Sequence, residues 1–257
     1  MSEKEHMDEN ISGIYNYCDR WCDKCSYTNR CLVFKREAER NIKHILRDED
    51  PNDPDVFAKD ISDTFQETFD LIKEKMNEDD FPESIDEDEL DFDDEPDFEI
   101  DNIENSSTGV RNVHNPLIDI TEKLFKDFLE YHKTISSKYP DEPIENMDRI
   151  LEENLDILSW HTPQIHIKAR MCAWGKSKLL KSRSLLQKEI EEDILNVNSR
   201  IAYVGIENCI EALNNIYEHL YEMQTETLSL LSAAKKIKEM IITNFPNVLT
   251  YKRPYFD

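Results

Sequence analysis

The chain has 257 residues, which suits one large domain or two small ones. Charged residues make up 34% of it and it contains only 4 glycines, so the composition favours helices over strand-rich folds, which need many glycine-containing turns. The net charge of −25 argues against a protein that coats nucleic acid or an anionic membrane. No apolar run reaches the length of a membrane span and the acidic start is unlike a signal peptide, so we expect a cytoplasmic protein without membrane contact.

The first notable feature is a cluster of cysteines. Residues 1–12 are polar and are expected to form a flexible tail. Directly after them, four of the six cysteines fall within the fifteen residues YCDRWCDKCSYTNRC (17–31), the cysteine run. Cytoplasmic thiols stay reduced, so clustered cysteines there indicate a metal site or catalysis more often than disulfides. We therefore predict a metal site with four ligands, Cys18, Cys22, Cys25 and Cys31.

The spacing C-x3-C-x2-C-x5-C bears on the choice of metal. Four thiolates suit a tetrahedral zinc site or a [4Fe–4S] cluster, because both bind sulfur donors. Structural zinc sites usually combine two C-x2-C pairs a dozen or more residues apart, whereas this run has a single pair. Basic neighbours offset thiolate charge and aromatic neighbours can shield a cluster from water (Arg20, Lys24, Arg30; Tyr15, Tyr17, Trp21, Tyr27). The expected cofactor is a [4Fe–4S] cluster, with zinc as the alternative.

The cysteine run resembles known cluster-binding segments. Cys18-x3-Cys22-x2-Cys25 matches the three-cysteine motif of radical SAM enzymes, but those enzymes place it in a glycine-rich α/β barrel, unlike this glycine-poor helical chain. The part from Cys22 to Cys31 resembles the C-x2-C-x-aromatic-x3-C segment of CRISPR-associated and recombination exonucleases, and the auxiliary-cluster domains of peptide-modifying radical enzymes. No nuclease core accompanies it, so the resemblance implies cluster binding and not nuclease activity. Together with the ending Phe245-Pro246 and YKRPYFD (251–257), the run resembles an uncharacterised bacterial family, which implies no particular activity.

Two amphipathic helices are expected after the cysteine run. In the first, over 27–47, apolar residues recur at helical spacing until the sequence DEDPNDP ends it. Asp53 then offers an N-cap with Pro54 at the first helical position. An apolar stripe predicts a second helix over 54–77 (Phe57, Ile61, Phe65, Phe69, Ile72, Met76). We group residues 13–77 as a metal-binding segment with two helices.

Residues 78–112 form an acidic segment. Between 78 and 104 it contains 16 Asp and Glu and no Lys or Arg, which is more than half of the net charge. Such dense like charge cannot pack on itself, so an extended chain is expected. The segment is either a solvated linker or a strap whose apolar residues dock on a basic surface of this chain or of a protein partner (Phe81, Leu90, Phe92, Phe98, Ile100, Ile103).

Residues 113–257 are expected to form a four-helix up-down bundle, which makes the whole fold all-α. The helices are placed at about 115–138, 143–174, 187–222 and 225–244. Asn115 is the N-cap of the first, and Pro163 is expected to kink the second.

The third bundle helix carries two stripes. The larger residues follow 3-4-3-4 spacing and should form the main seam (Tyr203, Ile206, Ile210, Leu213, Tyr217, Leu220). Beside them lies a row of small residues that would let a neighbouring helix come close (Ala202, Gly205, Cys209, Ala212). Cys209 and Cys172 are then small buried hydrophobic residues and not metal ligands.

A helical bundle can also hold a metal between carboxylates and histidines. The candidate ligands here are Glu122, His132, His161, Glu207 and Glu211. The Glu-x-x-His pattern typical of di-iron bundles does not occur within the bundle, and a single inward histidine is more often a satisfied core residue.

The stretch from Ser159 to Lys188 contains basic residues and no acid. One interpretation is an anion-binding patch for a phosphate-bearing ligand, a nucleic acid or an acidic partner (Lys168, Arg170, Lys176, Lys178, Lys181, Arg183). The favoured interpretation is that the acidic segment is its counter-charge within the molecule.

Three functional hypotheses remain. No glycine-rich phosphate loop, nucleophile elbow or kinase signature is present, which argues against an unaided hydrolase or transferase. The leading hypothesis is a metal-binding protein with a [4Fe–4S] cluster that serves electron transfer or redox sensing. The alternatives are a zinc-stapled helical interaction protein and a helical-bundle metalloenzyme with a carboxylate–histidine site.

Overall fold

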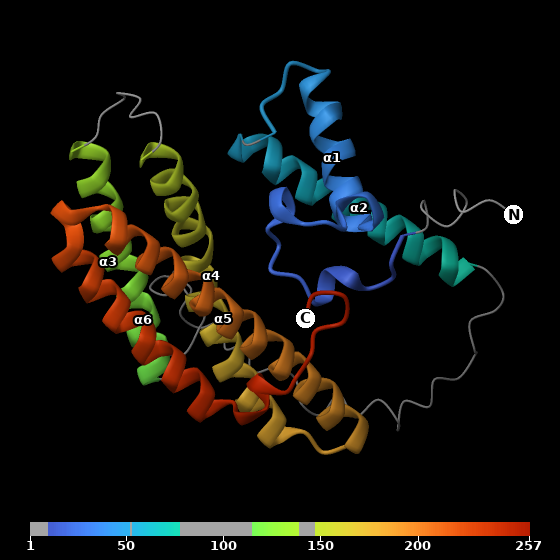
Figure 1. Cartoon of the computed structure of the whole chain (residues 1–257). Helices are drawn as coiled ribbons and strands as arrows, with labels where there is room; N and C mark the ends of the chain where they lie inside the picture. The colour runs from blue at the N-terminus through green and yellow to red at the C-terminus, as the bar shows by residue number, and fades with distance from the viewer. Residues whose placement is uncertain (1–9, 52, 78–114, 139–146) are drawn as a thin grey trace, which may run out of the picture. The chain divides into compact units, whose positions relative to one another are not determined.

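The computed structural model describes residues 10–51, 53–77, 115–138 and 147–257, and every regular element in these ranges is a helix. The expected all-α fold is thus confirmed for the described residues. The chain divides into two compact units (Figure 1). Unit 1 combines Met1–Leu32 with Val113–Asp257, and unit 2 is Val33–Asn112. The cysteine run therefore belongs to the same unit as the C-terminal helices.

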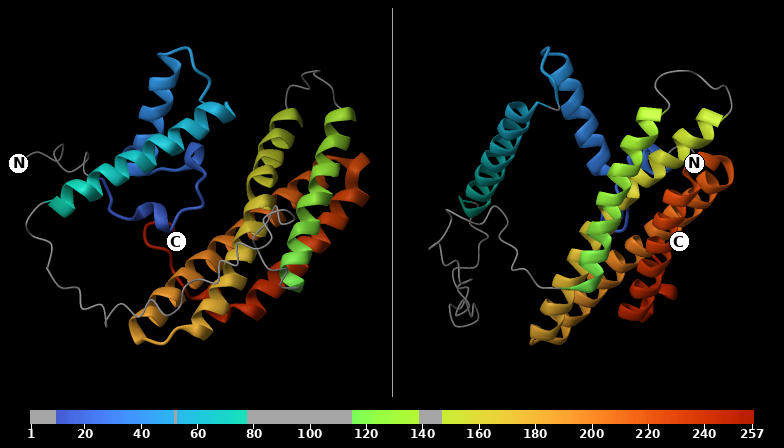
Figure 2. Two further views of the ribbon diagram at one scale, coloured as in Figure 1. Left: turned by 180° about the vertical axis from the view of Figure 1, so that it is seen from behind. Right: turned by 90° about the vertical axis from the view of Figure 1, so that its left-hand side faces the viewer.

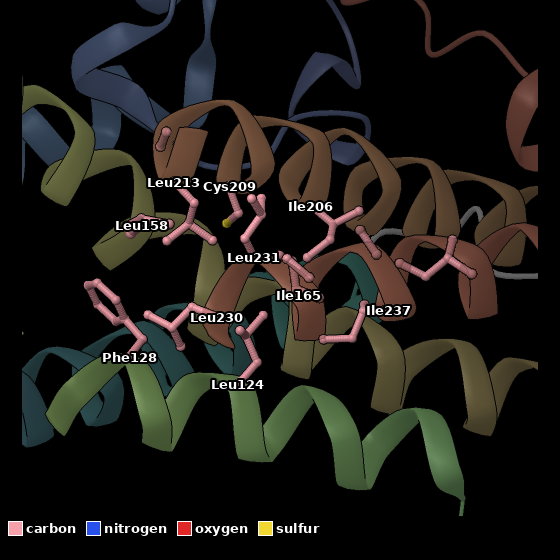
Figure 3. Close-up of a cluster of buried hydrophobic side chains, with 14 of the residues drawn as sticks. Leu124, Phe128, Leu158, Ile165, Ile206, Cys209, Leu213, Leu230, Leu231 and Ile237 are labelled. Atoms are coloured by element: carbon pink, nitrogen blue, oxygen red, sulfur yellow. The ribbon is translucent and has the colours of Figure 1, made fainter. Parts of the chain in front are cut away.

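Four long helices make up most of unit 1: α3 (Pro116–Lys138), α4 (Met147–Lys181), α5 (Leu185–His219) and α6 (Gln224–Asn244). α3 contacts α4 and α6, and α5 contacts the same two helices (Figure 2). Their inward side chains form one apolar core (Figure 3), which includes Leu124, Leu158, Ile165, Ile206, Leu213 and Ile237. The small residues of α5 are fully buried, as their spacing predicted (Ala202, Gly205, Cys209, Ala212).

The helix starts agree with their capping residues. Asn115 Oδ1 accepts a hydrogen bond from the Leu117 amide at 3.0 Å, and Asp53 Oδ1 accepts one from the Asp55 amide at 2.8 Å. These contacts satisfy amides that have no partner inside the helix. Both predicted starts are confirmed.

The connection between α4 and α5 is shorter than expected. The prediction ended the second bundle helix at 174 and began the third at 187. In the structure, α4 runs to Lys181 and α5 begins at Leu185. Lys and Leu are good helix formers, so only the residues around Ser184 interrupt the helix, and Ser184 Oγ caps α5 by accepting from the Gln187 amide at 3.1 Å. α4 also continues through Pro163. The start expected at Pro143 lies outside the described residues.

The N-terminal boundaries differ as well. α1 spans Leu32–Ile45 and not 27–47, because Thr28–Arg30 forms a separate 3-10 turn. The expected tail over 1–12 is wrong at its end, where Ile11 is buried and its amide donates to the Arg30 carbonyl at 2.9 Å.

Unit 2 contains α1 and α2 (Pro54–Asn77), the second of which has the predicted bounds. His44 is 6% exposed and joins the two helices: Nδ1 lies 2.7 Å from Glu49 Oε2 and Nε2 lies 3.0 Å from Asp60 Oδ1. Arg40 pairs with Asp60 at 3.3 Å. The apolar stripe of α2 remains exposed (Phe57, Ile61, Phe65, Phe69).

The acidic run 78–104 lies outside the described residues, so its expected extended form stays a prediction. Within the described ranges, none of the helices combines the length and apolar character that a membrane crossing requires.

Candidate metal centre

The cysteine run folds as a series of tight turns. Three 3-10 turns, η1 (Ile14–Asn16), η2 (Cys22–Lys24) and η3 (Thr28–Arg30), follow one another along the segment. Gly13 and Arg20 have positive φ angles of 71° and 64°, which change the direction of the chain before η1 and before η2. Each of the four cysteines lies at or beside a turn, so no long element separates the thiols.

Cys22 and Cys25 share one turn. The Cys25 amide donates to the Cys22 carbonyl at 3.1 Å, and the Tyr27 amide donates to Cys25 Sγ at 3.4 Å. This hydrogen bond holds the Cys25 side chain beside the turn.

Trp21 anchors the cysteine run on α4. Its ring stacks on Trp160 with centroids 5.8 Å apart and meets the edge of His161 at 5.3 Å. Beside this contact, Gln164 Nε2 donates to the Asp19 carbonyl. The backbone on either side of Arg20 is thus attached to one face of the helix.

A second anchor comes from the end of the chain. Tyr27 Oη donates to the Tyr255 carbonyl at 3.0 Å, and the Tyr27 ring packs on Phe256 at 5.6 Å. Arg253 is buried and makes three hydrogen bonds to the Asp257 carboxylate, one from its backbone amide and two from its side chain, each 3.1 Å long. Arg200 Nε also donates to this carboxylate at 3.0 Å. We call residues 246–257 the C-terminal clasp.

Some neighbours of Cys18 lower the pKa of its thiol and others raise it. Burial raises the pKa of the Cys18 thiol, a hydrogen bond with the Arg20 backbone and the Arg20 charge lower it, and Asp19 and then Cys31 raise it. Burial likewise lowers the pKa of Lys168, while Cys172 and Cys18 raise it. Cys18 therefore has Cys31 and two basic side chains in its surroundings.

All four cysteines of the run are half-buried. In the described ranges, no three Cys, His, Asp or Glu side chains lie close enough together to hold one metal ion. Cys172 and Cys209 are fully buried, and burial raises the pKa of Cys172 to about 12, which agrees with their assignment as core residues.

The carboxylate and histidine candidates have other partners. Glu122 pairs with Lys126 on the surface of α3, and the His132 ring meets the edge of Phe128 at 5.9 Å. Glu207 accepts hydrogen bonds from Tyr203 Oη at 3.0 Å and from Lys238 Nζ at 2.9 Å. Such contacts are typical of residues with a structural role or a surface position.

His161 and Glu211 are the remaining two candidates. His161 is 1% exposed, as expected for an inward residue, and burial lowers its pKa. Asn208 Nδ2 donates to its Nε2 at 3.1 Å, which leaves Nδ1 without a partner among the described residues. Glu211 is exposed on α5. The described residues thus offer no support for a second metal site.

Part of the basic patch has structural roles. Lys168 Nζ donates to Asn198 Oδ1 at 2.9 Å, and Lys176 Nζ lies 4.5 Å from the centre of the Phe245 ring. Lys178 lies 3.8 Å from the Trp174 ring and pairs with Glu191 at 3.7 Å. Lys181 and Arg183 are exposed and Arg170 is half-buried, so these three remain candidates for anion contacts.

No protein-family model matches the chain, and comparisons with curated proteins and with solved structures also give no match. The function is therefore argued from the residues of the site itself.

Proposed function

We propose that the protein binds a [4Fe–4S] cluster through Cys18, Cys22, Cys25 and Cys31, and that it serves electron transfer or redox sensing. The observation that carries this proposal is the position of all four thiols on one short series of turns, anchored both on α4 and on the C-terminal clasp. Anchoring limits the conformations of the unloaded segment, so less entropy is lost when the ligands are fixed.

The geometry of the thiols is one argument for a cluster over zinc. A single zinc ion needs four sulfurs at about 2.3 Å from one point. A cubane presents four iron corners, so its ligands stay farther apart and can come from successive turns. In the described run the four cysteines lie at or beside successive turns.

The surroundings also suit a cluster. When bound, a [4Fe–4S] cluster supplies one-electron exchange. Its four thiolates leave a net charge of about −2, which Arg20 and Lys168 beside Cys18 would offset. The Tyr27 amide donates to Cys25 Sγ, and hydrogen bonds to sulfur favour the reduced state.

Zinc is the second candidate, because the shared turn of Cys22 and Cys25 suits it equally well. Under this alternative the metal only fixes the segment on unit 1, and function lies in protein contacts. For the scaffold we propose the up-down four-helix bundle, which is supported by the packing of α3 and α5 against both α4 and α6.

Serine variants test the ligand assignment. Protein purified without oxygen should contain iron and sulfide and absorb visible light, and C22S should lose most of both. The matched control is C172S, which alters a cysteine outside the cysteine run and should keep the cluster. Equal iron in C22S and the parent would overturn the assignment, and zinc in place of iron in the parent would select the alternative.

A further inference from the structure

A half-open cavity of about 380 Å³ lies beside the cysteine run, and the proposed metal centre does not use it. Three parts of unit 1 line it: the cysteine run, α4 and α5. The lining residues are Trp21, Lys24, Glu153, Asn154, Ile157, Asn208, Glu211 and Asn215. The volume is within the range of small-molecule sites, roughly 300–1,000 Å³.

Carboxamides form the base of the cavity. Asn154 is only 5% exposed; its Nδ2 donates to the Ile150 carbonyl at 2.6 Å, and its Oδ1 accepts from Asn215 Nδ2 at 3.1 Å. Asn208 Nδ2 is likewise occupied, by His161. The amide donors of Asn208 and Asn215 thus bond inward, whereas their Oδ1 atoms accept no hydrogen bond from the part of the chain described here. Such oxygens are complementary to a ligand that donates hydrogen bonds.

The rim adds negative charge. Glu211 has no ion pair among the described side chains, and Glu153 has only an exposed contact of 3.5 Å with Arg149. An exposed pair of this kind contributes little, so both carboxylates are available to a ligand. Lys24 is the sole basic lining residue, and within the described ranges it pairs with neither glutamate.

An aromatic wall completes the cavity. Trp21 is held in place by Trp160 and His161, and Ile157 adds apolar surface. One face of the Trp21 ring is stacked on Trp160 and Lys24 Nζ lies 6.0 Å from the ring centre, so the indole offers a ligand apolar surface for an alkyl stem. The cavity therefore combines acceptor oxygens, carboxylates and an aromatic surface, which together are typical of sites for organic cations.

We propose that this cavity binds a small organic cation with a primary ammonium group. The ammonium group lies between Glu211 and the free Oδ1 atoms of Asn208 and Asn215, and its alkyl stem packs against Trp21 and Ile157. None of the four cysteines lines the cavity.

Binding of 1,4-diaminobutane to the full chain, measured by titration calorimetry at low salt, tests the proposal. We expect saturable binding, which E211Q weakens about tenfold or more because it removes a charge-assisted contact. K24Q should bind the diamine more tightly than the parent, because it removes a like charge from the cavity wall. The matched control is E218Q, which changes an exposed glutamate of α5 outside the cavity and should leave the affinity unchanged.

Succinate, an anion of the same chain length, should bind at least tenfold more weakly than the diamine. The proposal is overturned if the diamine does not bind at millimolar concentration, if E211Q and E218Q have equal affinities, or if succinate binds as well as the diamine. Metal analysis of the same samples reports separately on the proposed metal centre.

Discussion

Gly205 marks a close approach of α5 to α4. A Cβ atom at this position would lie 3.2 Å from His161 Nδ1 and 3.3 Å from Ile165 Cγ1, both in fully buried side chains that have little room to move. We expect G205A to lower the free energy of unfolding by about 1–3 kcal/mol, although alanine is the better helix former. Denaturant unfolding followed by circular dichroism measures this change in the free energy of unfolding.

Gly175 is the matched control for this substitution. A Cβ atom there would lie 3.6 Å from Leu195 Cδ1, which is an ordinary contact. G175A should therefore leave stability unchanged or raise it by up to about 1 kcal/mol. Equal destabilisation by both substitutions would contradict the close packing inferred at Gly205.

His44 makes unit 2 sensitive to pH. Its hydrogen bond with Glu49 raises its pKa above the ordinary value, burial opposes this, and Asp60 raises it further. A raised folded pKa means that the protonated imidazole stabilises the fold fully below the unfolded pKa of about 6.5. That contribution is lost as the pH rises through the folded pKa. Amide exchange in α1 and α2 should therefore become faster above that pKa.

The H44Q variant should abolish this pH dependence, because glutamine can hydrogen-bond but does not titrate in this range. The charged groups that face the imidazole or its partners are Glu49, Asp60, Arg40, Arg47 and Lys59. An NMR titration of the His44 ring that gives a pKa at or below the ordinary histidine value would refute the account.

The burial of individual residues was predictable from the sequence where it depended only on the periodicity of one helix. The spacing of His161, and of the row around Gly205 and Cys209, placed them inward, and all three are buried. Gln164 and Arg253 were not predicted as anchors of the cysteine run, because their partners are carbonyls distant in the sequence. Such contacts leave no local pattern.

At the scale of elements, the cysteine run depends on Trp21 for its attachment to α4. We expect W21A to remove the stack on Trp160 and to make amide exchange faster across residues 17–31. A metal held by this run should then be lost to a chelator about tenfold faster. Hydrogen exchange and chelator kinetics on the same samples measure both effects.

The control for this prediction is W174A. Trp174 lies on α4 but is 62% exposed and has no part in the anchor. Its removal should leave exchange in the cysteine run unchanged. If W21A also leaves it unchanged, Trp21 is not the anchor described here.

Element boundaries were predictable where a capping residue precedes a proline, as at Asp53 and Asn115. The predicted break at 174 failed because a glycine and several basic residues resemble a loop in sequence, whereas Gly175 packs against Leu195 inside continuous helix. For α1 the predicted helix began too early. The apolar periodicity extended to residue 27, but the turn Thr28–Arg30 breaks the helical hydrogen bonding.

At the scale of the whole molecule, the cysteine run is sequence-adjacent to α1 but belongs with the C-terminal helices. Sequence order suggested one group over 13–77, because nothing in the run identifies its distant partners. The anchors on Trp160 and Tyr255 explain the actual grouping. The proposed metal centre is therefore a part of the scaffold formed by α3 to α6 and not of unit 2.

The measurement that tests the central claim most directly is the iron, zinc and acid-labile sulfide content of the full chain purified without oxygen. A [4Fe–4S] cluster on four cysteines predicts iron and sulfide in equal amounts, close to four of each per chain, and no stoichiometric zinc. Protein that contains neither iron nor zinc under these conditions would contradict the assignment of Cys18, Cys22, Cys25 and Cys31 as metal ligands.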